Sequence, residues 1–344
     1  TDVTGLTIGK DLGSTAHTDT ITIGGTTSIA GPINVFAGTI NVNANLSSTL
    51  ANAQILLKAS GDITMASGVD ITTQGGRQVF WSDSDASGAG AITSYNSAAN
   101  YGLFTTNGGD LVMAGGAGIG SPTGAAYGMQ AVNLAWATLS TGTGDITLRG
   151  ISNATGAYGI GLRFFTGTSL NGRNITLTGT GAANTGSNLG NWAVGFEGAA
   201  MTGSGTMSIT GIGGGSGSTG NDNHGVLVFG STITGTGSAT LTITGTGGGK
   251  SGAGTNNDGV NVAGSSTVKT ASGALTLIGT AGLNGSSEGV AFNDATTTLG
   301  DATTQLGGIT LRSNSLSFGT LATDHILGKG SLSIEPLTAN ATLG

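Results

Sequence analysis

The sequence predicts an all-β protein that winds into a parallel β-solenoid, and three observations lead to that prediction. Glycine supplies 68 of 344 residues and charged residues only 8%, a composition unlike that of an ordinary globular enzyme. A short apolar tetrad interleaved with Thr or Ser recurs about every 34 residues in the second half of the chain. Glu and Lys are scarce, and no apolar stripe with helical spacing extends over a useful length. We therefore expect almost no α-helix.

The tetrad is the clearest internal repeat. Its seven copies are Ile146–Arg149, Ile175–Thr178, Met207–Thr210, Leu241–Thr244, Leu275–Ile278, Ile309–Arg312 and Leu332–Glu335. Successive copies start about 23 to 34 residues apart, and three consecutive spacings are identical. Apolar residues alternate with hydroxyl residues, which places the apolar side chains on one face of a strand. The tetrads are therefore predicted to be strands.

Two further strand signals lie inside the repeat. The second motif occurs at Gly159–Leu162, Ala193–Phe196, Gly225–Val228, Gly259–Val262 and Gly289–Phe292, and a weaker third at Thr232–Thr234 and Thr267–Lys269. Two or three such short strands per unit can bury their inward faces only when successive units stack. Stacked units of this kind form a parallel β-solenoid.

The first part of the chain follows the same logic with shorter steps. Ile55, Ile63 and Ile71 each begin a strand-like segment, eight residues apart, so three segments make a turn of about 24 residues. We expect one solenoid over 1–344, with less regular turns and longer loops in 1–140, and repeats of about 34 residues in 141–344. Roughly 10 to 14 turns would make a rod on the order of 50 to 65 Å long.

The frequent residues suit this fold. Gly adopts the positive φ that tight corners need, and Asn does so at small cost. Thr favours extended backbone and keeps the outer face of a strand wet. Stacking of like residues in parallel turns predicts hydrogen-bonded ladders of Asn or Thr along the rod.

Charge and composition exclude several classes of protein. The chain has 10 Lys+Arg against 17 Asp+Glu, a net charge of −7 spread thinly, which disfavours nucleic acid as a partner. It has no cysteine and no apolar run long enough to span a membrane. It starts at Thr1 without an export signal, and we expect it to be a segment of a longer protein.

Several stretches resemble the filamentous-haemagglutinin-like exoproteins of Gram-negative bacteria, which are exported by two-partner or autotransporter secretion. The stretches are Gly38–Leu46, Ile55–Thr64, Val69–Gly76, Asn107–Val112, Thr143–Thr147 and Gly237–Ile243. The resemblance implies a right-handed β-helix on a secreted surface fibre, outside the cell or on the bacterial outer membrane.

Acidic residues are the first candidates for chemistry, because β-helices also host polysaccharide-cleaving enzymes. Asp62, Asp110 and Asp145 each follow a glycine at a corner, where Asp commonly caps backbone donors. A second set, Asp222, Asp258 and Asp294, is evenly spaced at close to the repeat length and could stack into an acidic stripe. Adjacent Asn residues favour corner chemistry for this set too, so we predict no catalytic residue.

One loop partly matches a calcium-binding pattern. Asp83, Asp85 and Ser87-Gly88 form Asp-x-Asp-x-Ser-Gly, but the twelfth position is Ser94 where the bidentate Glu should stand. The alternatives are a calcium loop and a polar turn between strands. We assign no metal or cofactor.

Other candidate sites are weak. His17, His224 and His325 have no partner at metal-ligand spacing. Trp81, Trp136 and Trp192 could stack on sugars, although packing over glycine-rich turns is the more common role. The Thr-rich strands lack the strict register that an ice-binding face requires.

The predicted function is structural and adhesive, without catalysis. The shaft would space or display sites for cell-surface receptors, matrix or glycans, and its open ends would favour end-to-end self-association. The alternatives are a polysaccharide-active β-helix, distinguished by acids of neighbouring turns converging in a groove with aromatic walls, and a calcium-stabilised fibre module.

Overall fold

The computed structural model describes residues 3–183, 185–186, 189–215, 217–249, 254–283, 286–294, 296–319 and 326–338. Within these ranges the chain contains strands and no α-helix. Nearly all strands belong to three long parallel sheets of 13, 11 and 11 strands, which we call sheets A, B and C. The predicted all-β parallel solenoid is confirmed.

Each turn contributes one strand to each sheet in the order A, B, C. Sheet A contains β1 (Leu6–Ile8), β4 (Ile33–Ala37), β7 (Ile55–Ala59), β10 (Gln78–Ser82), β13 (Leu111–Gly115), β17 (Ile146–Ser152), β20 (Ile175–Thr180), β24 (Thr206–Ile212), β28 (Thr240–Thr246), β31 (Leu275–Thr280), β34 (Ile309–Ser313) and β37 (Leu332–Glu335), with β14 (Ala126–Gly128) beside β17.

Sheet B contains β2 (Thr20–Ile23), β5 (Thr39–Val42), β8 (Ile63–Met65), β11 (Ile92–Tyr95), β15 (Gln130–Ala135), β18 (Ile160–Phe165), β22 (Val194–Glu197), β26 (Val226–Phe229), β29 (Val260–Ala263), β32 (Val290–Phe292) and β35 (Leu316–Ser317). Sheet C contains β3 (Thr27–Ile29), β6 (Leu46–Ala51), β9 (Asp70–Gln74), β12 (Gly102–Thr105), β16 (Ala137–Ser140), β19 (Ser169–Gly172), β23 (Ala200–Gly203), β27 (Thr232–Gly235), β30 (Thr267–Lys269), β33 (Thr298–Gly300) and β36 (Ile326–Leu327). A small pair, β21 (Thr185–Gly186) and β25 (Gly217–Ser218), lies outside them.

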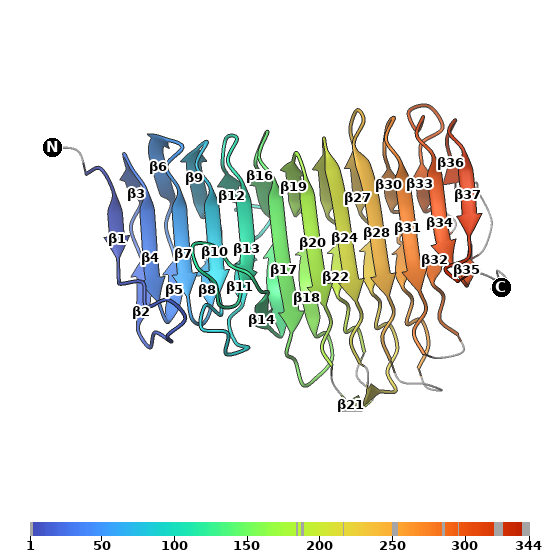
Figure 1. Ribbon diagram of the computed structural model, residues 1–344, viewed down its shortest axis with the longest axis horizontal. Coiled ribbons are helices and arrows are strands. Elements are labelled where there is room, and N and C mark those ends of the chain that lie inside the picture. Colours follow the sequence, from blue (N-terminus) through green and yellow to red (C-terminus); the bar gives the residue numbers. More distant parts are fainter. Residues whose placement is uncertain are drawn as a thin grey trace.

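The molecule is a rod whose axis runs across the strands (Figure 1). The 11-stranded sheets define eleven complete turns in the described part of the chain, which corresponds to roughly 50 Å of rod. Sheet A strands point down at the front and sheet C strands point up behind while the chain advances from left to right, so the coil is right-handed (Figure 1).

The three sequence motifs correspond to the three sheets. The tetrads lie in sheet A, the second motif in sheet B and the third in sheet C. In the earlier part, the segments that begin at Ile55, Ile63 and Ile71 form β7, β8 and β9, one complete turn. Period-two alternation therefore predicted these segments correctly as strands.

The core is a continuous column of stacked apolar side chains. Leu148, Leu177, Ile209, Ile243 and Leu277 occupy the same register position in five successive turns, and all are fully buried. Each side chain packs on its equivalents one turn away, so every turn is stabilised by the turns on either side.

A column of glycines closes the corner between sheets A and B. Gly179, Gly211, Gly245 and Gly279 align in successive sheet A strands. A Cβ on Gly245 would lie 1.9 Å from the backbone oxygen of Gly259, which precedes β29 in sheet B. The corner is therefore tight because these positions carry no side chain.

Two long insertions lie in the region 75–140, within the part of the chain for which longer loops are expected. Strands β10 to β13 and β15 continue all three sheets without interruption. The irregularity is confined to two insertions, 83–91 after β10 and 116–125 before β14. Loops could lengthen there because backbone pairing between turns is carried by the strands.

Candidate functional site

The long corners that lead from sheet A to sheet B in the later turns, between β17 and β32, lie at the lower edge of the rod (Figure 1). A hollow of about 450 Å³ lies between these corners and the outer face of sheet B. Its lining comes from five turns and consists of Tyr158, Leu189, Gly190, Trp192, Asp222, His224, Leu227, Phe229, Asn256, Asn261, Ala263 and Asn293. We call this hollow the aromatic groove.

A row of left-handed residues shapes one side of the aromatic groove. Tyr158, Gly190, Asp222 and Asn256 occupy the same corner position in four successive turns, with φ between 55° and 69°. Backbone bonds between turns establish this register, for example from Gly190 N–H to Asn221 O at 3.2 Å. Positive φ is uncommon for Tyr and is found where the surrounding structure over-determines a residue, often at functional sites.

Aromatic side chains form the walls. Tyr158 is 55% exposed and Phe229 is 53% exposed. Trp192 lies over the sheet face, where a Cβ on Gly195 would come within 2.9 Å of its ring. Large aromatic surface left open beside a hollow is typical of a binding site.

Two buried polar atoms in the lining have no hydrogen-bond partner among the described residues. They are the indole N–H of Trp192, a donor, and the Oδ1 of Asn261, an acceptor. Asn261 is only 4% exposed, and its Nδ2 donates to Asp258 at 2.6 Å. A buried polar atom without a partner is costly. These two atoms are therefore candidate contacts for a ligand.

Acidic residues of three turns gather behind this surface. Asp258 is buried, and its carboxylate accepts hydrogen bonds from Glu288 N–H at 2.8 Å and from Asn261. Burial, joined by the negative charges of Glu288 and Asp222, raises the pKa of Asp258. Asp222 lines the groove, whereas Asp258 lies beneath it.

His224 is neutral and does not form an ion pair with Asp258. Burial lowers the pKa of His224 to about 3. Its Nδ1 accepts the backbone N–H of Asp258 at 3.3 Å, so this nitrogen has no proton to give to the carboxylate 3.6 Å away.

Asp222, Asp258 and Asp294 do not stack into the acidic stripe that their spacing allowed. Asp222 stacks on Asn256, and Asp258 stacks between His224 and Glu288. Asp294 follows β32, at the opposite end of sheet B from the other two. The turn from His224 to Asp258 is longer than the turn from Asp258 to Glu288. Acids at a constant spacing in the sequence therefore occupy different register positions in successive turns.

The partial calcium loop separates its two acids. Asp83 lines a hollow with Ser87, Gly88 and Tyr127, whereas Asp85 lines a different one with His17 and Asp19. The described residues contain no group of three or more His, Asp or Glu side chains that could hold a metal ion. The calcium hypothesis therefore rests on the sequence pattern alone.

The corner aspartates act as predicted, although across turns. Asp62 accepts from Ala91 N–H at 2.8 Å and Asp110 accepts from Asp145 N–H at 3.0 Å. Asp145 in turn accepts from Asn174 N–H at 3.2 Å and binds Arg173. Each carboxylate caps a donor in the next turn, which explains the Gly-Asp pattern without catalysis.

The three tryptophans differ in role. Trp81 is buried, donates to Gly116 O at 2.7 Å and lies under the Lys58 ammonium, so it is a packing residue. Trp136 packs edge-on against Tyr101, with ring centroids 5.4 Å apart. Trp192 alone of the three lines the aromatic groove.

The other two histidines do not enter the groove. The distance from His17 Nδ1 to Asp19 Oδ1 is 3.5 Å, and His325 lies outside the described residues.

Sequence reasoning missed Tyr158 and Phe229 as groove residues. The available signal was the near-constant spacing of Tyr158, Gly190, Asp222 and Asn256, which is close to the length of one turn.

Within the described ranges no helix could cross a membrane. Comparison of the chain with known protein families, curated proteins and solved structures gives no match. The fold and the groove are therefore the basis for assigning a function.

Proposed function

We propose that this chain is part of the shaft of an exported bacterial surface protein and that the aromatic groove binds a carbohydrate of a neighbouring or host surface. The observation that carries the proposal is the set of exposed aromatic rings around two unpartnered polar atoms, the Trp192 indole N–H and Asn261 Oδ1. A pyranose has an apolar ring face and hydroxyls that both donate and accept, so it complements both features.

The shape of the molecule supports a role in display. Its three sheets run the length of the described chain and stack turn on turn, a geometry that extends by addition of further turns. The long corners are added at one edge of the rod and leave the strand pairing unchanged. A binding groove can therefore be carried by the shaft without altering it. The resemblance of several stretches to haemagglutinin-like exoproteins supports export to the cell surface.

Polysaccharide cleavage is the second candidate, because three acidic residues, Asp222, Asp258 and Glu288, come from three neighbouring turns. The charges of Asp222 and Glu288 contribute to the raised pKa of Asp258. A glycosidase needs two carboxyl groups that reach the scissile bond. Asp258 is 2% exposed and both of its carboxylate oxygens already accept hydrogen bonds. It does not line the groove, which favours binding over cleavage.

A glycan array followed by calorimetry on the retained sugar tests the proposal. Trp192→Ala and Phe229→Ala should each weaken binding about tenfold or more, because each removes aromatic contact area. Tyr95→Ala is the matched control, since Tyr95 is 55% exposed on β11, outside the groove. Absence of any retained glycan would overturn the proposal, and release of shorter saccharides would replace it with the enzyme alternative.

A further inference from the structure

A second hollow lies between the two insertions of the earlier turns. The loop 83–91 and the loop 116–125 enclose about 420 Å³. Gly116 N–H donates to Asp83 O at 3.1 Å, and Gly90 and Tyr127 exchange two backbone hydrogen bonds of 2.9 Å. These bonds tie the loops together, so the hollow is preformed. We call it the Asp83 pocket.

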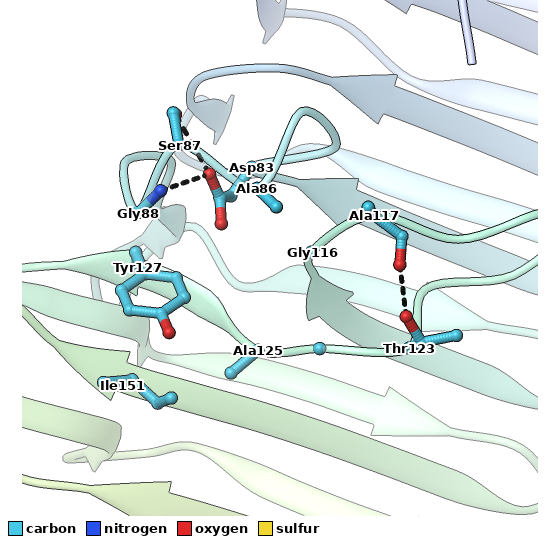
Figure 2. Close-up of a pocket in the computed structure, with 11 residues that line it drawn as sticks. Asp83, Ala86, Ser87, Gly88, Gly116, Ala117, Thr123, Ala125, Tyr127 and Ile151 are labelled. Carbon is cyan, nitrogen blue, oxygen red and sulfur yellow. Dashed lines mark hydrogen bonds between the residues drawn. The ribbon is translucent and has the colours of Figure 1, made fainter. Parts of the chain in front are cut away.

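The two oxygens of the Asp83 carboxylate have different surroundings: Oδ1 binds the loop and Oδ2 faces the pocket. Asp83 is 1% exposed. Its Oδ1 accepts hydrogen bonds from the Ser87 hydroxyl at 3.1 Å, from Gly88 N–H at 2.9 Å and from Ala89 N–H at 3.2 Å. Its Oδ2 is buried and has no partner among the described residues. Figure 2 shows this second oxygen pointing away from the loop, toward the side of the pocket that carries Tyr127 and Ala125.

The remaining walls carry no positive charge. They are formed by the ring of Tyr127, by Ala86, Ala117, Ala125 and Ile151, and by Thr123, whose hydroxyl donates to Ala117 O (Figure 2). Three donors on Oδ1 favour the ionised carboxylate, while burial, the largest influence, raises the pKa of Asp83. A buried carboxylate without a counter-ion is costly. The pocket thus offers an acceptor, an aromatic ring and apolar contacts, and lacks only the cation.

We infer that the Asp83 pocket binds a primary alkylammonium group, with the ammonium donating to Asp83 Oδ2 and the alkyl chain packing on Ala117, Ala125 and Ile151. An ammonium supplies donors and no acceptor, which matches the buried, unpartnered acceptor Asp83 Oδ2 in this lining. The Tyr127 ring adds cation–π attraction. A hydrated divalent metal ion would leave the apolar walls without a partner.

Two kinds of molecule carry a primary alkylammonium group that would fit the pocket: a free aliphatic amine and a partner protein with an exposed lysine side chain. The inference does not depend on carbohydrate binding, because the two sites share no residue. A Trp192→Ala variant should bind amines normally, and an Asp83→Asn variant should bind glycans normally.

Saturation-transfer NMR and calorimetry with n-butylamine at pH 7 test the inference, with n-butanol as the neutral probe of similar size. The amine should bind and the alcohol should bind at least about tenfold more weakly, since a hydrogen bond between two charged groups is stronger than one from a neutral hydroxyl. Nα-acetyl-lysine N-methylamide forms the second arm. Tighter binding of this compound than of butylamine indicates a lysine side chain as the source.

Two variants and one control complete the test. Asp83→Asn keeps an oxygen for the loop donors and tolerates the local φ of 47°, and it should weaken amine binding about tenfold or more. Ala117→Leu, at an exposed position, should block the pocket without entering the core. Asp85→Asn should leave binding unchanged, because Asp85 is outside the pocket. Equal binding of the alcohol, unchanged binding in Asp83→Asn, or binding of Ca²⁺ alone that Asp83→Asn abolishes would overturn the inference.

Discussion

Asn223 and Asn257 are joined across one turn by two hydrogen bonds to a single oxygen. The backbone N–H of Asn223 donates to Asn257 Oδ1 at 2.8 Å, and the Asn223 side-chain amide donates to the same oxygen at 3.1 Å. Asn191 bonds to Asn223 in the same way, at 3.2 and 2.8 Å. All three side chains are fully buried, so they form a ladder inside the corner beside the aromatic groove.

Replacing Asn223 with Ala should break this ladder in the middle. The substitution removes the oxygen that accepts both hydrogen bonds from Asn191 and the side-chain amide that donates to Asn257 Oδ1, and we expect a loss of about 2–4 kcal/mol in the free energy of unfolding. Thermal unfolding followed by circular dichroism measures the effect. Asn41→Ala, at a partly exposed position of β5, should change the midpoint little. Equal midpoints for Asn223→Ala and wild type would contradict a stabilising role for the ladder.

The glycine column should not accept a side chain. A Cβ at position 245 would lie 1.9 Å from Gly259 O, so Gly245→Ala must push sheet A away from the start of β29. We expect a loss of about 2–3 kcal/mol or more. Gly24→Ala is the control, because nothing lies within 4 Å of its Cβ position and its φ is not left-handed. Urea denaturation that ranks the two variants alike would show that the corner can open freely.

His224 should make the protein sensitive to acid. Its pKa is about 3 in the folded state against an ordinary value of 6.5, so between these values the unfolded chain binds the proton more readily than the folded chain. The stability contributed by neutral His224 is therefore complete above pH 6.5 and is lost as the pH falls toward 3, on the order of a few kcal/mol.

The His224→Asn variant tests this pH dependence. Asn retains an acceptor for the backbone N–H of Asp258 and does not titrate. Its melting temperature should fall less than that of the wild type between pH 7 and pH 4. Asp258 has a raised pKa and acts in the opposite direction, because its protonated form stabilises the fold at low pH. A wild-type slope that persists in His224→Asn would assign the acid sensitivity to other groups.

The described end of sheet A should promote self-association. Leu332 and Ile334 on β37 continue the inward apolar rows of Ile309 and Leu311, yet they are 50% and 40% exposed. Covering each such side chain contributes roughly 1.5–3 kcal/mol. Ile334→Lys should therefore weaken end-to-end association about tenfold in sedimentation velocity, whereas Thr310→Lys, on the outer face of β34, should leave it unchanged. A monomeric wild-type chain at high concentration would exclude association through this end.

Much of the architecture could be predicted from local patterns. Alternation of apolar and hydroxyl residues in Leu241–Thr244 predicts a strand, and its repetition at Leu275–Ile278 predicts a neighbouring turn; the two pair in register as β28 and β31. Corner aspartates such as Asp110 were correctly assigned to backbone capping. These features depend on contacts between equivalent positions of adjacent turns, so a linear spacing is enough to predict them.

The candidate sites could not be predicted in the same way. The aromatic groove combines Tyr158 with Phe229, which lie two turns apart, and neither residue type recurs at the equivalent position of the neighbouring turns. The Asp83 pocket depends on the bonds between two insertions, which no periodicity describes. Contacts between residues of different loops depend on the length and path of each loop, and neither can be inferred from composition or from the repeat spacing.

By itself, the sequence determined an all-β solenoid with one strand per sheet in each turn, because period-two alternation and a regular repeat leave stacking as the way to bury the apolar faces. Only the tertiary structure decided which corner residues meet. Backbone hydrogen bonds between turns set that register, and the unequal lengths of successive turns place Asp258 in register with His224 and Glu288, and not with Asp222 and Asp294.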